Sequence, residues 1–163
     1  MSFTSAVITV SDKGAHGERE DSSGVALESL LMDAGAASVA RVIVPDERNQ
    51  ITAALREYCC EKKVDLVVTT GGTGLTARDV TPEATREVIE REVPGFAEAI
   101  RAASLKITPR AMLSRAVSGI RGQTLVINFP GSPKACEESF AVIRPVIGHA
   151  LELLAGNSGD CAR

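Results

Sequence analysis

The chain has 163 residues and a formal net charge of -3 at pH 7, with one Tyr and no Trp. A net negative protein so poor in aromatic residues is not expected to bind nucleic acid, and an anionic ligand would need a local site. The length suits one globular domain with its own core, so we predict a single domain over residues 1–163. Residues 1–14 lack a basic region ahead of an apolar stretch, and no apolar run could span a bilayer. We therefore expect a cytoplasmic protein that does not bind a membrane.

The first half of the chain alternates between strand-like and helix-like patterns. Short runs of β-branched residues predict strands, and apolar residues at helical spacing predict helices. The predicted order is strand 3–10, helix 24–34, strand 39–44, helix 47–62 and strand 64–70. The centre of the last strand is almost continuously apolar, which is typical of a parallel strand covered on both faces. A long polar segment, residues 11–24, follows the first strand and has the character of a functional loop.

Proline residues mark where helices begin in the second half. Thr81 is the expected N-cap of a helix that continues to residue 92, with Pro82 in its first position. Ser132 and Pro133 repeat this signal at the start of the last helix. The other predicted elements are a helix to residue 106 that begins at Pro94-Gly95, an antiparallel hairpin or closely paired strands within 116–131, and an end of the last helix near residue 155.

Alternating strands and helices predict a three-layer α/β/α fold with a mostly parallel sheet and one antiparallel hairpin or edge strand. Ligands of such folds bind outside the carboxyl ends of the strands. Polar residues follow four of the predicted strands at those ends, namely Ser11 and Asp12, Asp46, the stretch from Gly71 to Asp79, and Gly131 with Ser132. The sequence therefore predicts that these loops share one edge of the sheet.

Thr69-Thr70-Gly71-Gly72-Thr73-Gly74 is the most informative local feature. Successive small residues let backbone amides converge on an anion, and the threonine hydroxyls add donors. The loop is not a phosphate-binding Walker A motif, because no Gly-Lys-Ser/Thr ends it. Its other interpretations are a simple tight turn and, from the pattern Gly72 to Ala77, a dinucleotide site of an oxidoreductase. The late helix start at Thr81 and the position after the third strand disfavour the dinucleotide interpretation.

Three carboxylates, Asp12, Asp46 and Asp79, are predicted to lie beside this loop. They would repel a phosphate ligand unless a divalent cation bridged carboxylate and phosphate oxygens, as Mg²⁺ does with nucleoside triphosphates. We therefore predict Mg²⁺ as a cofactor, held by Asp46 and Asp79 through the phosphates. Simpler interpretations remain for two of them: Asp46 as a helix N-cap and Asp12 as a turn former beside Gly14. Capping explains Asp79 poorly, because it precedes the expected cap by two positions.

Basic side chains could neutralise the phosphates of a ligand. The candidates are Arg78, Arg115 and Lys134, and each could equally be a solvated surface cation. Lys134 lies in the first turn of the last helix, where the helix dipole disfavours a cation unless an anion is close. Ser132 could be simply the N-cap of that helix.

Together these motifs resemble the Mog/MoaB family of molybdenum cofactor biosynthesis, whose fold also occurs in gephyrin and in MoeA proteins. The resemblance extends from about Ala6 to Leu154 and depends on TVSDKG, TTGGTGLTARDVTPEAT, VPGF and LSRAVSGIRGQTLVINFPGSP. It implies a molybdopterin adenylyltransferase, an enzyme that joins ATP to molybdopterin. The terminal phosphate of molybdopterin attacks the α-phosphate of ATP with the help of Mg²⁺, giving adenylyl-molybdopterin and pyrophosphate.

The resemblance also assigns residues and partners. It implies Asp46 and Asp79 as catalytic residues. The implied ligand-binding residues are Ser11 and Asp12 beside the nucleotide, Thr70, Gly71, Gly72, Thr73 and Gly74 around the phosphates, and Ser114, Arg115, Gly131 and Ser132 on the pterin side. The family implies a homotrimer or hexamer, with a molybdenum insertase as the partner that would receive the product. A non-catalytic molybdopterin carrier is the alternative function, and the choice between Mog-type and MoaB-type stays open.

Overall fold

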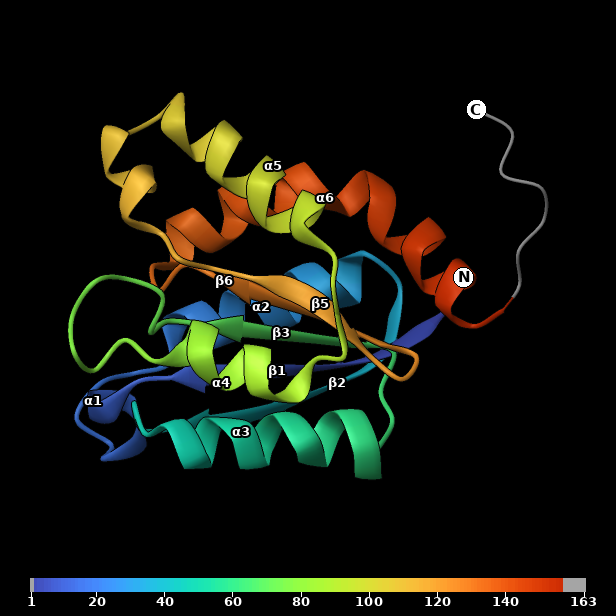
Figure 1. Cartoon of the computed structure of the whole chain (residues 1–163), viewed down its shortest axis with the longest axis horizontal. Coiled ribbons are helices and arrows are strands. Elements are labelled where there is room, and N and C mark those ends of the chain that lie inside the picture. The colour runs from blue at the N-terminus through green and yellow to red at the C-terminus, as the bar shows by residue number, and fades with distance from the viewer. Residues whose placement is uncertain (1, 157–163) are drawn as a thin grey trace.

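The structure, a computed structural model, describes residues 2–156 and is built on a six-stranded sheet in the order β2-β1-β3-β6-β5-β4 (Figure 1). The strands are β1 (Phe3–Val10), β2 (Ala36–Val44), β3 (Leu66–Thr70), β4 (Arg91–Glu92), β5 (Ser118–Arg121) and β6 (Thr124–Phe129). The helices are α1 (Asp12–Ala15), α2 (Ser22–Asp33), α3 (Arg48–Arg56), α4 (Thr81–Val88), α5 (Pro94–Leu105) and α6 (Pro133–Leu154). Strands β2, β1, β3 and β6 are mutually parallel, whereas β5 pairs antiparallel with both of its neighbours, β6 and β4.

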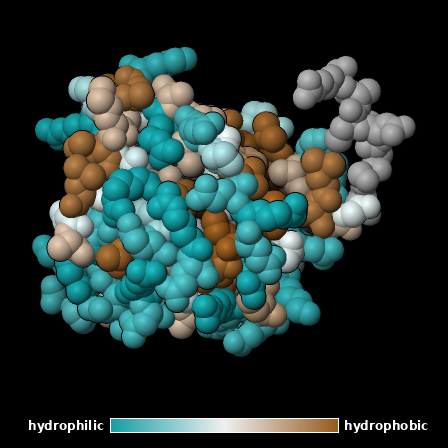
Figure 2. Space-filling view, viewed as in Figure 1, coloured by the Kyte–Doolittle hydropathy of each residue, from teal (hydrophilic) through white to brown (hydrophobic). Residues whose placement is uncertain are grey.

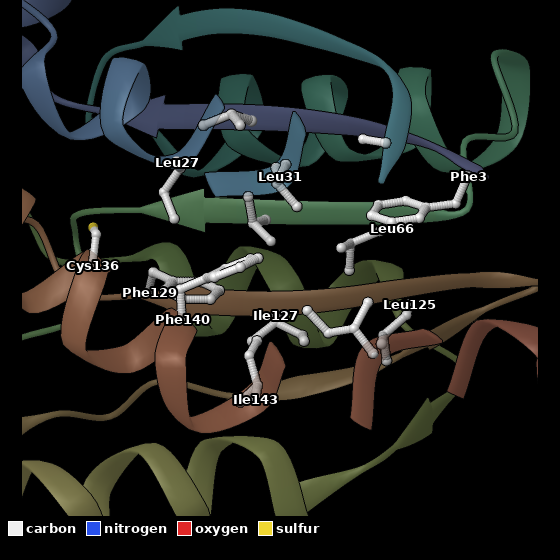
Figure 3. Close-up of a cluster of buried hydrophobic side chains, with 14 of the residues drawn as sticks. Phe3, Leu27, Leu31, Leu66, Leu125, Ile127, Phe129, Cys136, Phe140 and Ile143 are labelled. Carbon is white, nitrogen blue, oxygen red and sulfur yellow. The ribbon is translucent and has the colours of Figure 1, made fainter. Parts of the chain in front are cut away.

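Helices cover both faces of this sheet, which confirms the predicted three-layer α/β/α fold. Successive residues of a strand point to opposite faces, so Val68 packs with α2, α5 and α6, whereas Val67 packs with α3 and α4. Figure 3 shows the first of these clusters, in which Leu27 of α2 and Phe140 of α6 meet Phe129 of β6. Within residues 2–156, no helix is both long enough and apolar enough to cross a membrane.

The hairpin predicted within residues 116–131 is present as β5 and β6, with Arg121 opposite Thr124. The predicted helix to residue 92 is wrong in its last turn, because α4 ends at Val88 and Ile89 is extended. Arg91 and Glu92 instead form β4 and pair with β5. Cross-strand hydrogen bonds at the open edge of the hairpin thus replace a helical continuation that the local pattern favoured.

Two other helix predictions need correction. The predicted helix 47–62 is α3 followed by a π-helical turn over Glu57–Glu61. Thr81 is not the N-cap of α4 but its first residue, after Val80, and its hydroxyl donates to the carbonyl of Gly71 at 2.9 Å. A 3₁₀ helix over Pro109–Leu113, which the sequence pattern did not indicate, follows α5.

A buried asparagine joins the sheet to α4. Asn128 of β6 is fully buried, and its amide nitrogen donates to the hydroxyls of Thr69 at 2.9 Å and Thr85 at 3.0 Å. Its carbonyl oxygen accepts from the amide of Val117 at 3.1 Å. The Thr85 hydroxyl in turn donates to the carbonyl of Thr81 at 2.8 Å. The network therefore fixes the start of α4 against the ends of β3 and β6.

Asn128→Ala should lower the free energy of unfolding by about 3 kcal/mol, because it leaves buried donors and acceptors without partners. Urea unfolding followed by circular dichroism measures this change. Asn49→Ala, at an exposed position of α3, is the matched control and should stay within about 0.5 kcal/mol of the unsubstituted protein. Equal stability of the two variants would contradict a structural role for the network.

Candidate functional site

The four parallel strands end at one edge of the sheet, and the polar segments that follow them meet there. Thr9 of β1 pairs with Thr70 of β3, and Thr70 pairs with Phe129 of β6. Figure 1 shows α1 and the loop between β3 and α4 together at the left end of the sheet. The edge surrounds a cavity of about 590 Å³, which we call the first cavity. Of the residues predicted from the sequence, Ser11, Asp46, Thr70, Gly71, Gly72, Gly131 and Ser132 line it.

Residues 70–74 form the glycine loop, of which Thr70, Gly71 and Gly72 line this cavity. Gly71 and Gly72 have φ angles of +94° and +66°, which L side chains rarely adopt. A Cβ atom on Gly71 would collide with the carbonyl of Val10, and one on Gly72 with the hydroxyl of Thr81. Within residues 2–156, the amides of Gly72, Thr73 and Gly74 donate no hydrogen bond. The loop therefore offers close backbone approach and free donors to an anion.

Asp12 and Asp46 lock the ends of β1 and β2 together. The amide of Asp12 donates to a carboxylate oxygen of Asp46 at 2.9 Å, and the amide of Asp46 donates to Asp12 at 3.0 Å. Glu47 is the N-cap of α3, although its side chain makes no capping hydrogen bond, so the capping interpretation of Asp46 is wrong. Asp12 begins α1, whose N-cap is Ser11. Burial is the main cause that raises the pKa of Asp46 above its ordinary value. The charges of Asp12 and Asp79 act in the same direction, whereas the hydrogen bond from the Asp12 amide opposes the shift.

Asp79 lies on the other side of the glycine loop from Asp46. Its carboxylate accepts from the amide of Thr76 at 2.9 Å and from the Thr76 hydroxyl at 2.8 Å. A Cβ atom on Gly72 would lie 3.3 Å from Oδ1 of Asp46, and one on Gly74 would lie 2.9 Å from Oδ2 of Asp79. The two carboxylates thus flank the loop at the same edge of the sheet.

A second cavity, of about 280 Å³, lies beyond the glycine loop. Its wall includes Thr73, Gly74 and Ser114 together with the apolar side chains of Ile100, Ile107 and Leu113. Because Gly72 lines the first cavity and Gly74 the second, the loop is shared by the two. The site can therefore hold two ligand groups on a shared loop, one in a polar cavity and one in a cavity with more apolar residues in its wall.

The three cations proposed from the sequence do not line the first cavity. Arg78 donates to both carboxylate oxygens of Asp12, at 3.1 and 2.8 Å, and to Glu47 at 2.7 Å. This pairing is the main cause that holds the pKa of Asp12 below its ordinary value. Lys134 is exposed and lies 4.0 Å from Glu138. Arg115 contacts Glu83 and the backbone of the loop after β3.

The sequence did not predict one part of the wall of the first cavity, the residues just before α2 and in its first turn. Arg19, Glu20, Asp21, Ser22 and Ser23 all line the first cavity, and Arg19 is the basic residue among the lining residues. Asp21 accepts from the amide of Gly24 at 3.0 Å as the N-cap of α2 and from the Thr9 hydroxyl at 2.9 Å. The polar segment 11–24 was the signal, but it did not indicate which of its residues would fold back over β1.

The carboxylates can contribute to a metal site only together with a ligand. Among residues 2–156, no group of three or more His, Cys, Asp or Glu side chains could hold a metal ion. Asp12, part of the predicted acidic constellation, has both oxygens engaged by Arg78. Mg²⁺ commonly takes one or two protein carboxylates and completes its shell with substrate phosphates and water. Asp46 and Asp79, on either side of an anion-accepting loop, fit that arrangement.

Comparison with known proteins agrees with this geometry. The sequence model of a family described as a probable molybdopterin binding domain matches residues 6–149. The molybdopterin adenylyltransferase of Helicobacter pylori J99 is 43% identical over 153 residues, which cover 93% of this chain and 87% of that protein.

Solved structures of related proteins share the fold. The MoaB protein of Thermus thermophilus has a TM-score of 0.87 at 47% identity, over 94% of this chain and 97% of that one. The Mog protein of Mycobacterium ulcerans has a TM-score of 0.89 at 36% identity, over 96% and 99% of the two chains. The chain thus belongs to the molybdopterin-binding domain family that includes the Mog and MoaB proteins.

Proposed function

We propose that this protein is a molybdopterin adenylyltransferase that uses ATP as co-substrate, in the biosynthesis of the molybdenum cofactor. The observation that carries the proposal is the pair of cavities that share the glycine loop, with Asp46 on one side of the loop and Asp79 on the other. The names and the 40–43% identity of relatives from Helicobacter pylori and Escherichia coli support it. We further propose that the chain acts as one domain in the cytoplasm.

The reaction needs positioning more than side-chain chemistry. A terminal phosphate oxygen of molybdopterin attacks the α-phosphorus of ATP, the bond from that phosphorus to the β-phosphate bridging oxygen breaks, and pyrophosphate leaves with the electron pair. Because the attacking group is already an anionic phosphate oxygen, no general base is required. The two phosphate groups must instead be brought into line and their charge offset.

Residues of the two cavities divide this task. We assign the nucleotide to the first cavity, beside Ser11, and the pterin to the second, beside Ser114. Gly131 and Ser132 line the first cavity, so this assignment puts them on the nucleotide side and not on the pterin side that the resemblance implied. The amides of Gly72, Thr73 and Gly74 would hold phosphate oxygens at the shared wall. Asp12 acts through Asp46, whose carboxylate accepts a hydrogen bond from the Asp12 amide.

Asp46 and Asp79 would hold Mg²⁺ through the phosphates. The cation would offset the phosphate charge and stabilise the departing pyrophosphate. Without it, two carboxylates beside an anion-accepting loop would repel the substrate phosphates.

The direct test is to incubate the protein with molybdopterin, ATP and Mg²⁺ and to measure pyrophosphate. Pyrophosphate release that depends on all three components is expected. Molybdopterin binding without pyrophosphate would mean that the protein is a carrier. Binding of a nicotinamide dinucleotide in place of ATP would mean that the site serves an oxidoreductase.

Asp79→Asn should lower kcat for pyrophosphate release by about 100-fold, since it removes one of the charges that hold the cation beside the phosphates. The Kd for molybdopterin, measured by fluorescence titration, should change by less than about threefold, because Asp79 is not among the residues that line the second cavity, to which the pterin is assigned. Asp33→Asn, at an exposed position near the end of α2, is the control and should keep full turnover. Full adenylylation by Asp79→Asn would remove that residue from the mechanism.

Removal of Mg²⁺ should abolish turnover and weaken ATP binding. ATP titrated by calorimetry in Mg²⁺ and in EDTA compares the two states, and excess Mg²⁺ after EDTA should restore the reaction. Equal binding and turnover in EDTA would contradict the assigned role of the carboxylates.

We propose that the protein is a homo-oligomer, a trimer or hexamer, which hands its product to a molybdenum insertase. Large apolar side chains are exposed at the end of α5 and in the 3₁₀ helix that follows, including Ile107 at 60% and Met112 at 70%. Figure 2 shows brown side chains at the upper left, where Figure 1 places these elements. Exposed apolar surface of this kind favours association with another protein surface.

Light scattering should therefore give the mass of three chains or of six. Met112→Glu should shift the distribution toward single chains at micromolar concentration, because a charge would be buried in the contact. Met32→Glu, at a half-exposed position in the last turn of α2, is the control. A single-chain mass for the unsubstituted protein at all concentrations would contradict the proposed assembly.

A further inference from the structure

Arg115 holds both ends of the segment that carries Asp79. It lies between the 3₁₀ helix and β5, and its own amide donates to the carbonyl of Thr73 at 2.9 Å. Nε of its side chain donates to the carbonyl of Gly74 at 2.8 Å, and a terminal nitrogen donates to the carbonyl of Asp79 at 2.6 Å. One guanidinium thus closes residues 74–79 into a ring.

Glu83 completes the arrangement from the first turn of α4. Both of its carboxylate oxygens accept hydrogen bonds from Arg115. The helix that carries it is anchored in the core through Ala84 and Val88, which are 0% and 2% exposed. The guanidinium is therefore oriented by a rigid element and in turn orients a loop, a geometry that favours planar, multiply bonded arginine over lysine.

The hydrogen-bonding capacity of Arg115 is largely used inside the protein. A guanidinium has five N–H donors on three nitrogens, and here every nitrogen already donates to Gly74, Asp79 or Glu83. A substrate phosphate could bind Arg115 only by displacing these partners. This differs from the expectation, based on the sequence, that Arg115 binds a ligand on the pterin side.

Apart from Arg115, residues 74–79 are held mainly through the side chain of Arg78. Leu75 is 63% exposed, and Thr76, Ala77 and Arg78 are exposed as well. Within the segment, the side chain of Asp79 is tied only to Thr76, which belongs to the same loop. The contacts of Arg78 with Asp12 and Glu47 tie this segment to the loops that follow β1 and β2. Arg115 is the side chain that contacts both ends of the segment, the carbonyls of Gly74 and Asp79, and so fixes the two ends relative to each other.

We propose that Arg115 is a positioning residue which, oriented by Glu83, holds segment 74–79 so that the Asp79 carboxylate faces the glycine loop. The proposal rests on the proposed adenylyltransferase function for its effect on turnover. Its structural part, the ordering of the loop, is measurable without substrates. Positioning and phosphate binding by Arg115 lead to different outcomes. A lysine, which keeps the positive charge, could replace Arg115 in binding a phosphate but could not make the several hydrogen bonds that position the loop.

The test compares Arg115→Gln, Arg115→Lys and Glu83→Gln, with Arg86→Gln as the control. Arg86 lies on the same helix as Glu83, and its guanidinium pairs with Glu92 at 3.3 Å, away from the loop. Steady-state kinetics of pyrophosphate release give kcat and the KM values for ATP and molybdopterin. Amide hydrogen exchange of the free proteins reports the order of residues 74–79.

Positioning predicts that Arg115→Gln lowers kcat by at least about tenfold while both KM values change by less than about threefold. Exchange of the amides in 74–79 should rise, and Arg115→Lys should not rescue either quantity, because one ammonium cannot contact both carbonyls and Glu83 together. Glu83→Gln should change both quantities in the same direction by a smaller factor. Arg86→Gln should leave them unchanged.

If Arg115 binds phosphate directly, Arg115→Gln should instead raise the KM for ATP or molybdopterin by at least about tenfold, and Arg115→Lys should restore it. Amide hydrogen exchange in residues 74–79 would stay unchanged. This set of results would overturn the proposal. If the unsubstituted protein releases no pyrophosphate, the adenylyltransferase assignment fails, but loop exchange still decides whether Arg115 orders the segment. If Arg115→Gln does not fold, Glu83→Gln carries the same comparison. Unchanged exchange in Glu83→Gln would then count against the proposal.

Discussion

Thr70 pairs with Thr9 on one side and with Phe129 on the other, so that three parallel strands end at the same level. Parallel pairing of this kind requires helical crossovers, and these helices bury the sheet on both faces. Every strand end at that level must then continue as a loop on the same edge. The glycine loop, the Asp12–Asp46 exchange and the start of α6 are adjacent because of this register, and the candidate site depends on it.

Most charged side chains at this edge form ion pairs with each other. Arg78 is engaged by Asp12 and Glu47, and Arg115 by Glu83, so both arginines serve the architecture of the loops. Asp46 and Asp79 are the acidic groups left beside the glycine loop. Such an edge presents amide donors and carboxylates together, a combination that favours a cation bound jointly with phosphate over a bare anion.

Two separate lines of support lead to the proposed adenylyltransferase function. One is that relatives of the chain are molybdopterin adenylyltransferases, and the other is the geometry at the carboxyl edge of the sheet. Identity of 43% to the Helicobacter pylori protein extends over 93% of the chain, so the relationship covers both cavities and both acidic loops. The geometry adds what similarity does not contain. Two cavities of different character share a wall of amides, as expected for joining a polar nucleotide to a pterin through their phosphates.

The sequence by itself determined the layered fold, the hairpin and the set of loops at one edge, because strand and helix periodicity and the carboxyl-end rule are local or topological. Only the tertiary structure decided that Arg91 and Glu92 form a strand, since β5 supplies hydrogen-bond partners that lie far away in the sequence. It also decided the partners of Arg78 and Arg115. Asp12 is 66 residues from Arg78, and Glu83 is 32 residues from Arg115. No local pattern specifies such contacts, because they depend on how the packed helices and strands place distant loops in space.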